Sequence, residues 1–418
     1  MLNVEEALEQ ILAVLEPLPI TNISILEADG MVLAKNIISQ IDIPPLDNSA
    51  MDGYAVKSDN VQNASPSLPI ALRVVGTTAA GQLPFQSLVD GHSVRIMTGA
   101  PIPLGSDAVI PFEETSDNSN ELNVTSNNEV LILHPAFQGK NIRQAGQDVR
   151  KGDKVITAGT VLRPAHIALI ASLGKSKVAV HRPPVVAVLA TGDEITKPGH
   201  QLTKGMIYDS NSYGIASSIK EAGGKPVVVG IARDNVDSIE RKLFEIKDCD
   251  LIITSAGVSK GDFDIVKNVL KKNGAIQFHS VRMKPGKPLA FGLLEQKNSS
   301  VPLIGLPGNP VSALVAFEQF CRPAIRLMSG HKLIARTTIN AVLDDTIDNP
   351  DGRRVYARVH AYKKKDVYHA SLTGEQSSNI LSAMGKANGL AICPENKTSI
   401  NAGEDVTVMM LYWNAEVF

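Results

Sequence analysis

The sequence has little of what marks secreted or membrane-spanning proteins. Its three cysteines, Cys249, Cys321 and Cys393, lie far apart and match neither a zinc site nor a disulfide framework. We therefore expect small buried side chains in a reducing compartment. No apolar run reaches the length of a membrane span, and the first residues, MLNVEEALEQ, are acidic where a signal peptide is basic. These absences predict a cytoplasmic protein.

An excess of charge of one sign is also missing. The chain has 41 Lys and Arg against 43 Asp and Glu, a net charge of −2. We therefore expect no bulk attraction to nucleic acid or to an anionic membrane, and any cationic site must be local. Its 44% hydrophobic and 20% charged residues are typical of a soluble globular protein. The length of 418 residues predicts two to four domains.

One stretch has the pattern of a strand, a turn and a helix that could hold an anion. Within residues 301–328 a short apolar run is followed by the turn GLPGNP and then by apolar residues at helical spacing. Asn309 is placed to cap this helix, and Pro310 suits its first position. The helix start favours an anion, and Lys284 and Lys287, which flank a Pro-Gly turn upstream, add two cations. An ordinary turn without a ligand is the alternative.

The rest of the chain divides by its hydrophobic pattern. Residues 4–15 predict an amphipathic helix that Asn3 caps, with Glu6 completing the capping box. After Gly330 strand patterns dominate, which predicts a small β-rich C-terminal domain of about 85 residues. Between residues 68 and 161 the pattern is also β. The strands expected there are 70–75, 93–97, 108–111, 130–133 and 154–156.

Strands and helices alternate from Pro183 to Gly330, which predicts a mostly parallel sheet with helices on both faces. Open parallel sheets bind ligands at the carboxyl ends of their strands. The residues expected at these ends include Glu194, Asp234, Asp264 and the GLPGNP loop. An aspartate at a helix start is often only a cap, however.

Three loops outside this region are dense in short polar side chains. They are PPLDNSAMDGYAV (44–56), RIMTGAPIPLGSDAVI (95–110) and GKNIRQAGQDVRKGD (139–153). Such loops usually satisfy their own backbone. Asp52, Thr98, Arg143 and Asp148 are candidates for a site only if the fold brings them together with the lysines.

Seven motifs, in this order along nearly the whole chain, together resemble the MoeA family. They are DNSAMDGYAV (47–56), RIMTGAPIPLGSDAVI, GKNIRQAGQDVRKGD, TGDE (191–194), AGVSKGDFD (256–264), MKPGKPLAFG (283–292) and GLPGNPVSA (305–313). The members are molybdopterin molybdenumtransferases, bacterial relatives of the gephyrin E domain.

The resemblance implies a multidomain subunit in an elongated homodimer. One domain is a three-layer α/β unit with a mostly parallel, MogA-like sheet, and the inserted and C-terminal domains are rich in β-structure. The segments expected are 1–20 (N-terminal helix on the α/β domain), 21–45 with 140–182 (linking domain), 46–139 (inserted), 183–330 (α/β) and 331–418 (C-terminal).

The reaction implied by the resemblance uses adenylylated molybdopterin, molybdate as substrate and Mg²⁺. Molybdenum enters the pterin dithiolene and the adenylyl group leaves as AMP, a step of molybdenum cofactor biosynthesis. Transient contacts with other enzymes of that biosynthesis also follow from it. Two alternatives remain: a molybdopterin-binding scaffold without turnover, and a molybdopterin adenylyltransferase.

Residue roles carry over one position at a time. The resemblance implies catalytic roles for Asp52, Thr98, Asp264 and Lys284. The positions implied in substrate binding are Arg143, Asp148, Glu194, Asp234, Ser259, Lys287, Pro307, Asn309 and Pro310. Glu194, Asp234 and Asp264 are the expected Mg²⁺ ligands, since Mg²⁺ prefers hard oxygen donors.

Two positions depart from the family pattern. Ala256 stands where members often have a glycine, and its methyl group could shift a phosphate near the backbone. Ser280 stands where some members have a further lysine, so the anion site is less cationic here.

Overall fold

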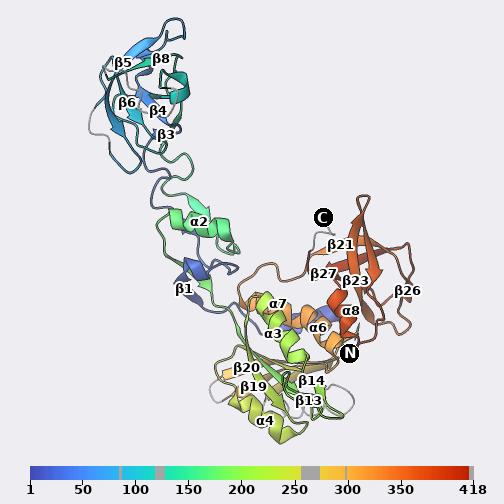
Figure 1. Ribbon diagram of the computed structural model, residues 1–418. Helices are drawn as coiled ribbons and strands as arrows, with labels where there is room; N and C mark the ends of the chain where they lie inside the picture. Colours follow the sequence, from blue (N-terminus) through green and yellow to red (C-terminus); the bar gives the residue numbers. More distant parts are fainter. Residues whose placement is uncertain (84–86, 118–127, 256–273, 297–298, 414–418) are drawn as a thin grey trace. The chain divides into compact units, whose positions relative to one another are not determined.

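The chain divides into two compact units, which are described separately (Figure 1). The computed structural model describes residues 1–83, 87–117, 128–255, 274–296 and 299–413. Unit 1 comprises Met1–Lys35, Gly159–Ile167 and Ser176–Phe418, and unit 2 comprises Asn36–Ala158 and Ala168–Lys175. The candidate site residues Asp264 and Ser259, together with Ala256, lie outside the described residues.

The α/β part of unit 1 is built on a six-stranded sheet in the order β15-β12-β16-β20-β19-β17. Its strands are β12 (Val185–Thr191), β15 (Lys225–Ala232), β16 (Leu251–Ser255), β17 (Gly274–Ser280), β19 (Pro288–Gln296) and β20 (Ser299–Leu306). The first four strands in this order are parallel, as expected, and β19 and β17 are antiparallel. The pattern did not predict β19, because its apolar run does not alternate and follows a turn.

Alternate residues of the central strand β12 point to two different hydrophobic cores. Val186 and Val188 pack with helices α3 (Asn211–Glu221) and α7 (Arg322–Met328). Ala187 and Leu189 pack with helix α4 (Val236–Glu245) on the other face. Figure 1 shows α3 and α4 on opposite sides of the sheet. This confirms the three-layer α/β domain.

The N-terminal helix α1 (Val4–Leu12) packs into the first of these cores. Asn3 Oδ1 accepts a hydrogen bond from Glu6 N (2.7 Å), and Glu6 Oε2 accepts one from Asn3 N (2.9 Å). The capping box and the amphipathic helix are therefore confirmed, although the helix ends three residues before Leu15.

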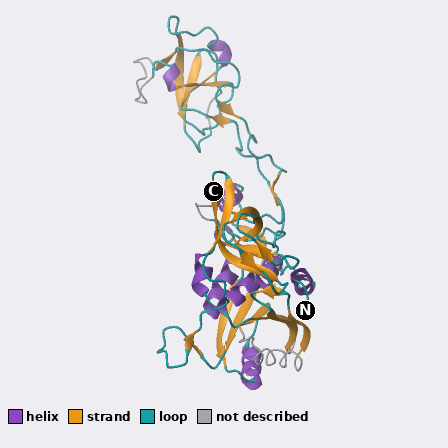
Figure 2. Cartoon of the chain, turned by 90° about the vertical axis from the view of Figure 1, so that its right-hand side faces the viewer, coloured by secondary structure: helices purple, strands orange, loops and turns teal. Residues whose placement is uncertain are grey.

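The helical segment after β20 is continuous, but its middle turn is π-helical instead of α-helical. Helix α6 (Pro310–Ala316) leads through the π-helical turn η4 (Phe317–Cys321) into α7. Its buried residues pack both on the sheet and on Tyr356, Leu390 and Met409 of the C-terminal strands. Figure 2 shows helices lying between the strands of these two parts.

The C-terminal part is a barrel-like sheet in the order β18-β23-β24-β21-β27-β25, which the additional pairing of β23 with β25 closes. The strands are β18 (Met283–Lys284), β21 (Thr338–Leu343), β23 (Arg354–Lys364), β24 (Val367–Leu372), β25 (Gly389–Cys393) and β27 (Asp405–Met410), with helix α8 (Leu381–Lys386). Strand β18 precedes β19 in sequence but pairs in parallel with β23. The turn that carries Lys284 is therefore tied to the C-terminal sheet.

Unit 2 contains a five-stranded sheet in the order β7-β4-β6-β5-β8. Its strands are β4 (Gly53–Val56), β5 (Ile70–Thr78), β6 (His92–Ile96), β7 (Ala108–Pro111) and β8 (Glu129–Ile132). Helix α2 (Pro164–Ser172) spans the boundary between the units in sequence. The predicted strands of this segment are confirmed, each within a few residues.

The other strands and the 3-10 turns of the described residues are short. The remaining strands are β1 (Ile20–Ser24), β2 (Ile37–Ile38), β3 (Asn48–Ser49), β9 (Ile142–Arg143), β10 (Lys154–Ile156), β11 (Lys177–His181), β13 (Ile195–Thr196), β14 (Ile207–Tyr208), β22 (Ile347–Asp348) and β26 (Ser399–Ile400). The 3-10 turns are η1 (Ile25–Glu27), η2 (Ser58–Asn60) and η3 (Phe112–Glu114). Within the described residues no helix is long and apolar enough to cross a membrane.

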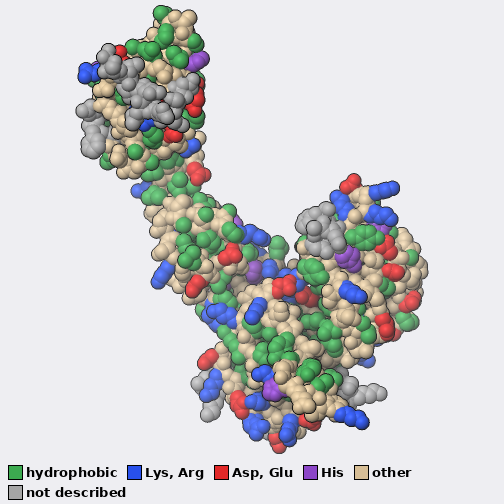
Figure 3. Space-filling model, viewed as in Figure 1, with side chains coloured by type: hydrophobic (Ala, Val, Ile, Leu, Met, Phe, Trp, Pro, Cys, Tyr) green, Lys and Arg blue, Asp and Glu red, His purple; other side chains and the backbone are tan. Residues whose placement is uncertain are grey.

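The surface charge agrees with the nearly balanced composition, and two of the three cysteines are buried as predicted. Figure 3 shows side chains of both charge signs interspersed over the face in view. Cys321 and Cys393 are buried free thiols, as predicted, and burial raises the pKa of each. Cys249 is only half-buried, which differs from the prediction, and burial raises its pKa to about 11.

Candidate active site

A polar cleft lies at the carboxyl ends of the parallel strands β12, β16 and β20 in unit 1. Its volume is about 470 Å³. The side chains that line it include Thr191, Glu194, Asp209, Asn211, Ser255, Pro307, Asn309, Pro310 and Ser312. The cleft thus occupies the edge of the sheet where the sequence predicted a ligand.

The turn after β12 brings Glu194 to this cleft. Gly192 has φ +147°, and a Cβ at this position would lie 2.6 Å from Ile195 Cγ1 and 2.8 Å from Glu194 Oε2. Only glycine fits such a turn without displacing its neighbours. The motif TGDE is therefore a tight turn that places one exposed carboxylate at the cleft.

We expect Gly192→Ala to disturb this turn and to weaken substrate binding. Gly199 is a matched control, because it also has a positive φ (+90°) but a Cβ there would meet no atom within 4 Å. Strain of this kind costs on the order of 1–3 kcal/mol. Gly192→Ala should melt at a lower temperature than Gly199→Ala and show a higher KM. Equal melting temperatures would contradict the steric argument.

The side chain of Asn211 joins three parts of the cleft. Its Nδ2 donates to Ser255 Oγ at the end of β16 (2.8 Å) and to the Gly308 carbonyl in the GLPGNP loop (2.7 Å). The neighbouring Asp209 is buried, and its Oδ1 accepts a hydrogen bond from Ser212 N at the start of α3 (3.0 Å). The sequence patterns missed both residues. The only signal was a polar Asp-Ser-Asn triplet before a helix.

One buried hydroxyl at the cleft has no partner in the protein. Thr191 is 4% exposed, and within the described residues its Oγ1 makes no hydrogen bond. A buried polar atom without a partner costs free energy. Because Thr191 lines the cleft, a bound ligand can supply the missing hydrogen bond.

The GLPGNP loop has the predicted position but a different local hydrogen bond. Asn309 is the residue before α6, and Pro310 is its first residue, as expected. The Asn309 side chain does not cap the helix, however, and its Nδ2 donates to Ser378 Oγ (3.0 Å). The Ser378 carbonyl also accepts from Val311 N (3.2 Å). This contact holds the loop against the C-terminal part of unit 1.

Lys284 and Lys287 are not among the residues that line the cleft, although Pro288 is. Lys284 lies in β18, opposite Val355 of β23. Its charge acts near Asp351, whose pKa is lowered mainly by the hydrogen bond from Arg353 and also by Lys284. The structure therefore places Lys284 on the C-terminal sheet, near Asp351 and Arg353.

Asp234 follows β15, the edge strand of the sheet, and is also not among the residues lining the cleft. The cap of α4 is its neighbour Asn235, whose Oδ1 accepts from Ser238 N (2.8 Å). Helix α4 is therefore capped by Asn235 and not by Asp234.

In unit 2 three of the polar motifs meet. Asp52 Oδ1 accepts hydrogen bonds from Thr98 N (2.6 Å) and Thr98 Oγ1 (2.9 Å). Arg143 pairs with Asn48 in the two-stranded sheet of β3 and β9, and Asp47 Oδ1 accepts from Ala145 N (2.7 Å). The predicted residues Asp52, Thr98 and Arg143 thus come from segments that contact one another. Asp148 is exposed on the same loop as Arg143.

The donor set of the cleft fits Mg²⁺. Within the described part of the chain no group of three or more His, Cys, Asp or Glu side chains is close enough to hold a metal, and Asp264 lies outside that part. Mg²⁺ is usually held by one or two carboxylates together with substrate phosphates and water. Glu194 and Asp209, both at the cleft, offer such carboxylates.

Comparison with known families agrees with this architecture. Residues 2–174 match the MoeA N-terminal region (domain I and II), and residues 340–411 match the MoeA C-terminal region (domain IV). Residues 187–327, which contain the parallel strands and most of the cleft, match a probable molybdopterin binding domain. The fold and the cleft therefore define a multidomain protein built around an α/β domain of the molybdopterin-binding class.

The similarity to individual proteins extends over the whole chain. Molybdopterin molybdenumtransferase of Haemophilus influenzae is 36% identical over 413 residues, 98% of each chain, and molybdopterin molybdenumtransferase 2 of Mycobacterium tuberculosis is 35% identical over 397 residues, 93% of this chain and 94% of that protein. The crystal structure of a molybdopterin biosynthesis MoeA protein from Pyrococcus horikosii has a TM-score of 0.83 at 31% identity and covers 99% of this chain and 100% of its own. The chain belongs to the MoeA family of molybdopterin molybdenumtransferases.

Proposed function

We propose that this protein inserts molybdenum into adenylylated molybdopterin, with molybdate as the second substrate and AMP as a product. This is a transferase reaction of molybdenum cofactor biosynthesis. The observation that carries the proposal is the polar cleft at the ends of β12, β16 and β20, in a chain that is similar over nearly its full length to molybdopterin molybdenumtransferases.

The cleft binds the phosphate-bearing part of the substrate. Thr191 Oγ1 has no hydrogen-bond partner in the described protein and donates to a phosphate oxygen. Asn211 holds the end of β16 and the GLPGNP loop at a fixed separation, so these walls are in place before the substrate arrives. Pro307, Asn309 and Pro310 form one side of the binding site.

Mg²⁺ belongs to the same proposal. Glu194 and Asp209 are the described carboxylates that would hold it, and Asp234 and Asp264 are the further candidates from the sequence. When bound, Mg²⁺ offsets negative charge that develops on phosphate oxygens. Lys284 and Lys287 add local positive charge that suits the molybdate anion.

Unit 2 holds further residues for which we propose roles in the reaction. Asp52 is the proposed catalytic carboxylate, and Thr98 orients it through two hydrogen bonds to a single oxygen. Arg143 and Asp148 are proposed substrate-binding residues, and Ser259 is a further one from the sequence.

The proposals for the oligomeric state, the domains and the protein partners rest on the family. We propose a homodimer, the five segments given above as domains, and transient contacts with other enzymes of cofactor biosynthesis. The domain assignment is supported by the ends of the three family matches at residues 174, 187, 327 and 340. The free thiols suit a reducing compartment, and we therefore propose the cytoplasm.

A single assay tests the function against its two alternatives. Purified protein is mixed with adenylylated molybdopterin, Mg²⁺ and a low concentration of molybdate, and AMP is measured. We expect AMP release that depends on molybdate. AMP release that is independent of molybdate would contradict metal insertion. Tight binding of the pterin without AMP release would instead indicate a scaffold.

A further inference from the structure

A second hollow of about 640 Å³ lies in unit 1, and it shares no lining residue with the candidate active site. It is formed by helix α7, the segment 332–337 and the end of β27 with Trp413. Four of its lining side chains are cationic, namely Arg322, Arg326, Lys332 and Arg336. Neither the sequence patterns nor the proposed reaction gives this cluster a role.

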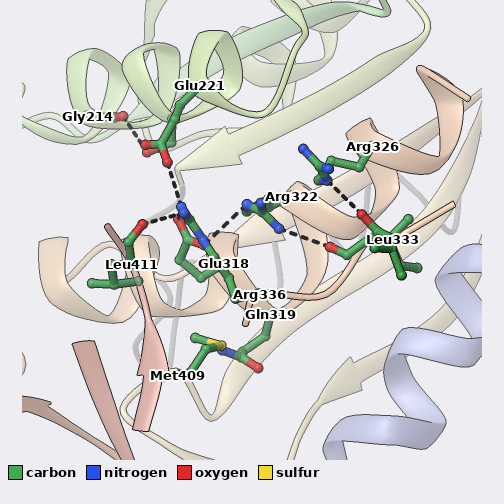
Figure 4. A network of polar contacts seen from close by, with 12 residues as sticks. Gly214, Glu221, Glu318, Gln319, Arg322, Arg326, Leu333, Arg336, Met409 and Leu411 are labelled. Carbon is green, nitrogen blue, oxygen red and sulfur yellow. Dashed lines mark hydrogen bonds and ion pairs between the residues drawn. The ribbon is translucent and has the colours of Figure 1, made fainter. Parts of the chain in front are cut away.

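Two carboxylates offset part of this charge (Figure 4). Arg336 Nε and Nη2 donate to the two oxygens of Glu318 (2.8 and 3.0 Å), and Nη2 also donates to Glu221 Oε1 (2.8 Å). Arg322 Nε lies 3.8 Å from Glu318 Oε2. Among the described residues of this network, four cations therefore face two carboxylates, and the Glu221 side chain is 59% exposed. Counted over these described side chains, a surplus of two positive charges remains.

The cationic groups are held in position by backbone carbonyls. Arg322 Nη1 donates to the Ile334 carbonyl (2.9 Å), and Arg326 Nε donates to the Leu333 carbonyl (3.1 Å). These two arginines are four residues apart on α7, so their charges lie on one face of the helix and repel each other. The chain thus keeps like charges together in a fixed arrangement.

This arrangement costs free energy unless an anion completes it. Burial, with repulsion from Arg336, lowers the pKa of Arg322 to about 10, and the same causes lower the pKa of Arg326. Nε of Arg322 has no hydrogen-bond partner within the described residues. His331 accepts a hydrogen bond from Arg326 and brings no charge at neutral pH, because burial and the neighbouring arginines lower its pKa to about 4.

We propose that this hollow binds the phosphate group of a small phosphate monoester. A phosphate dianion matches the surplus of two positive charges, and guanidinium groups bind its oxygens with directed hydrogen bonds. The hollow is larger than a phosphate ion needs, and most of its other lining residues are apolar. Leu333 and Trp413, which are 83% and 41% exposed, line it and would cover the organic part of the ligand. The proposal is independent of the proposed function.

Trp413 makes the proposal directly testable, because it is the single tryptophan of the chain. The full-length protein is titrated at constant ionic strength with phenyl phosphate, inorganic phosphate and phenol, and Trp413 fluorescence is recorded. We expect a saturable change with phenyl phosphate, weaker binding of inorganic phosphate and no saturation with phenol. Equal affinity for inorganic phosphate would overturn the assignment to a monoester, and equal affinity for phenol would overturn the role of the cations.

Reversing the charge of Lys332 tests whether the phosphate monoester binds in this hollow. Lys332 lines the hollow, is exposed and forms no ion pair among the described residues, so Lys332→Glu should fold normally. Lys364→Glu is the matched control, since Lys364 is exposed at the end of β23 and does not line the hollow. Lys332→Glu should weaken phenyl phosphate binding at least tenfold, and Lys364→Glu should change it less than twofold. Absence of saturable binding, or equal losses in both variants, would refute the proposal.

Discussion

Replacement of Asp52 by asparagine is expected to slow molybdate-dependent AMP release at least tenfold, about 1.4 kcal/mol of barrier, with an unchanged melting temperature. Asp52 Oδ1 accepts hydrogen bonds from both Thr98 N and Thr98 Oγ1. The amide oxygen of asparagine can accept the same two bonds, so the turn at Thr98 should survive. What the substitution removes is the negative charge of an exposed side chain.

A second aspartate of unit 2 provides the control for this experiment. Asp59 is exposed in η2, outside the three polar motifs, and accepts a hydrogen bond from Gln62 Nε2 (2.6 Å). Asp59→Asn should leave turnover unchanged. If Asp52→Asn instead lowered the melting temperature and kept full activity per folded molecule, Asp52 would be a structural residue that fixes the turn.

Local patterns were sufficient for several elements of the fold. The bounds 108–111 and 154–156 were predicted to the residue, because turn residues flank both of these short runs. Strand β19 was missed, because residues 289–292 are all buried and therefore show no alternation of apolar and polar side chains. The sequence also did not indicate which face of β12 packs against which helix. Only the tertiary structure shows this.

The candidate site was only partly predictable, for a similar reason. Glu194 and the GLPGNP loop were found because a strand pattern and a turn motif are adjacent in sequence. Asn211 was missed because its contact with Gly308 joins residues 97 positions apart, and no local pattern encodes that pairing. The polarity of a side chain indicates that it needs a partner, and only the fold determines which partner it finds.

Glu318 shows the same limit in the core of unit 1. It lies in the π-helical turn η4 within an apolar stretch, and its side chain is only 8% exposed. Its partner Arg336 comes from the segment after the helix and is 12% exposed. The sequence offered no sign that this glutamate is buried, because the cation that makes burial tolerable approaches from outside the helix.

We therefore expect Glu318→Ala to be the most destabilising single change in this network, by about 3 kcal/mol, the scale for breaking one side of a buried ion pair. Without Glu318, the arginines Arg322 and Arg336 would repel each other with little compensation. Glu221→Ala is the matched control, because it removes an ion pair of the same Arg336 whose carboxylate is 59% exposed. Such an exposed pair contributes about 0–1 kcal/mol.

Thermal unfolding of the two variants tests whether the Glu318 carboxylate contributes more to stability than the solvent-exposed Glu221 carboxylate. The Glu318→Ala protein should melt well below the wild type, and the Glu221→Ala protein close to it. Glu318→Gln should fall between them, because the amide retains one hydrogen-bond acceptor for Arg336 and loses the charge. Similar shifts for Glu318→Ala and Glu221→Ala would mean that solvent screens both carboxylates equally. In that case the free energy that Glu318 contributes would come from packing of its side chain rather than from its charge.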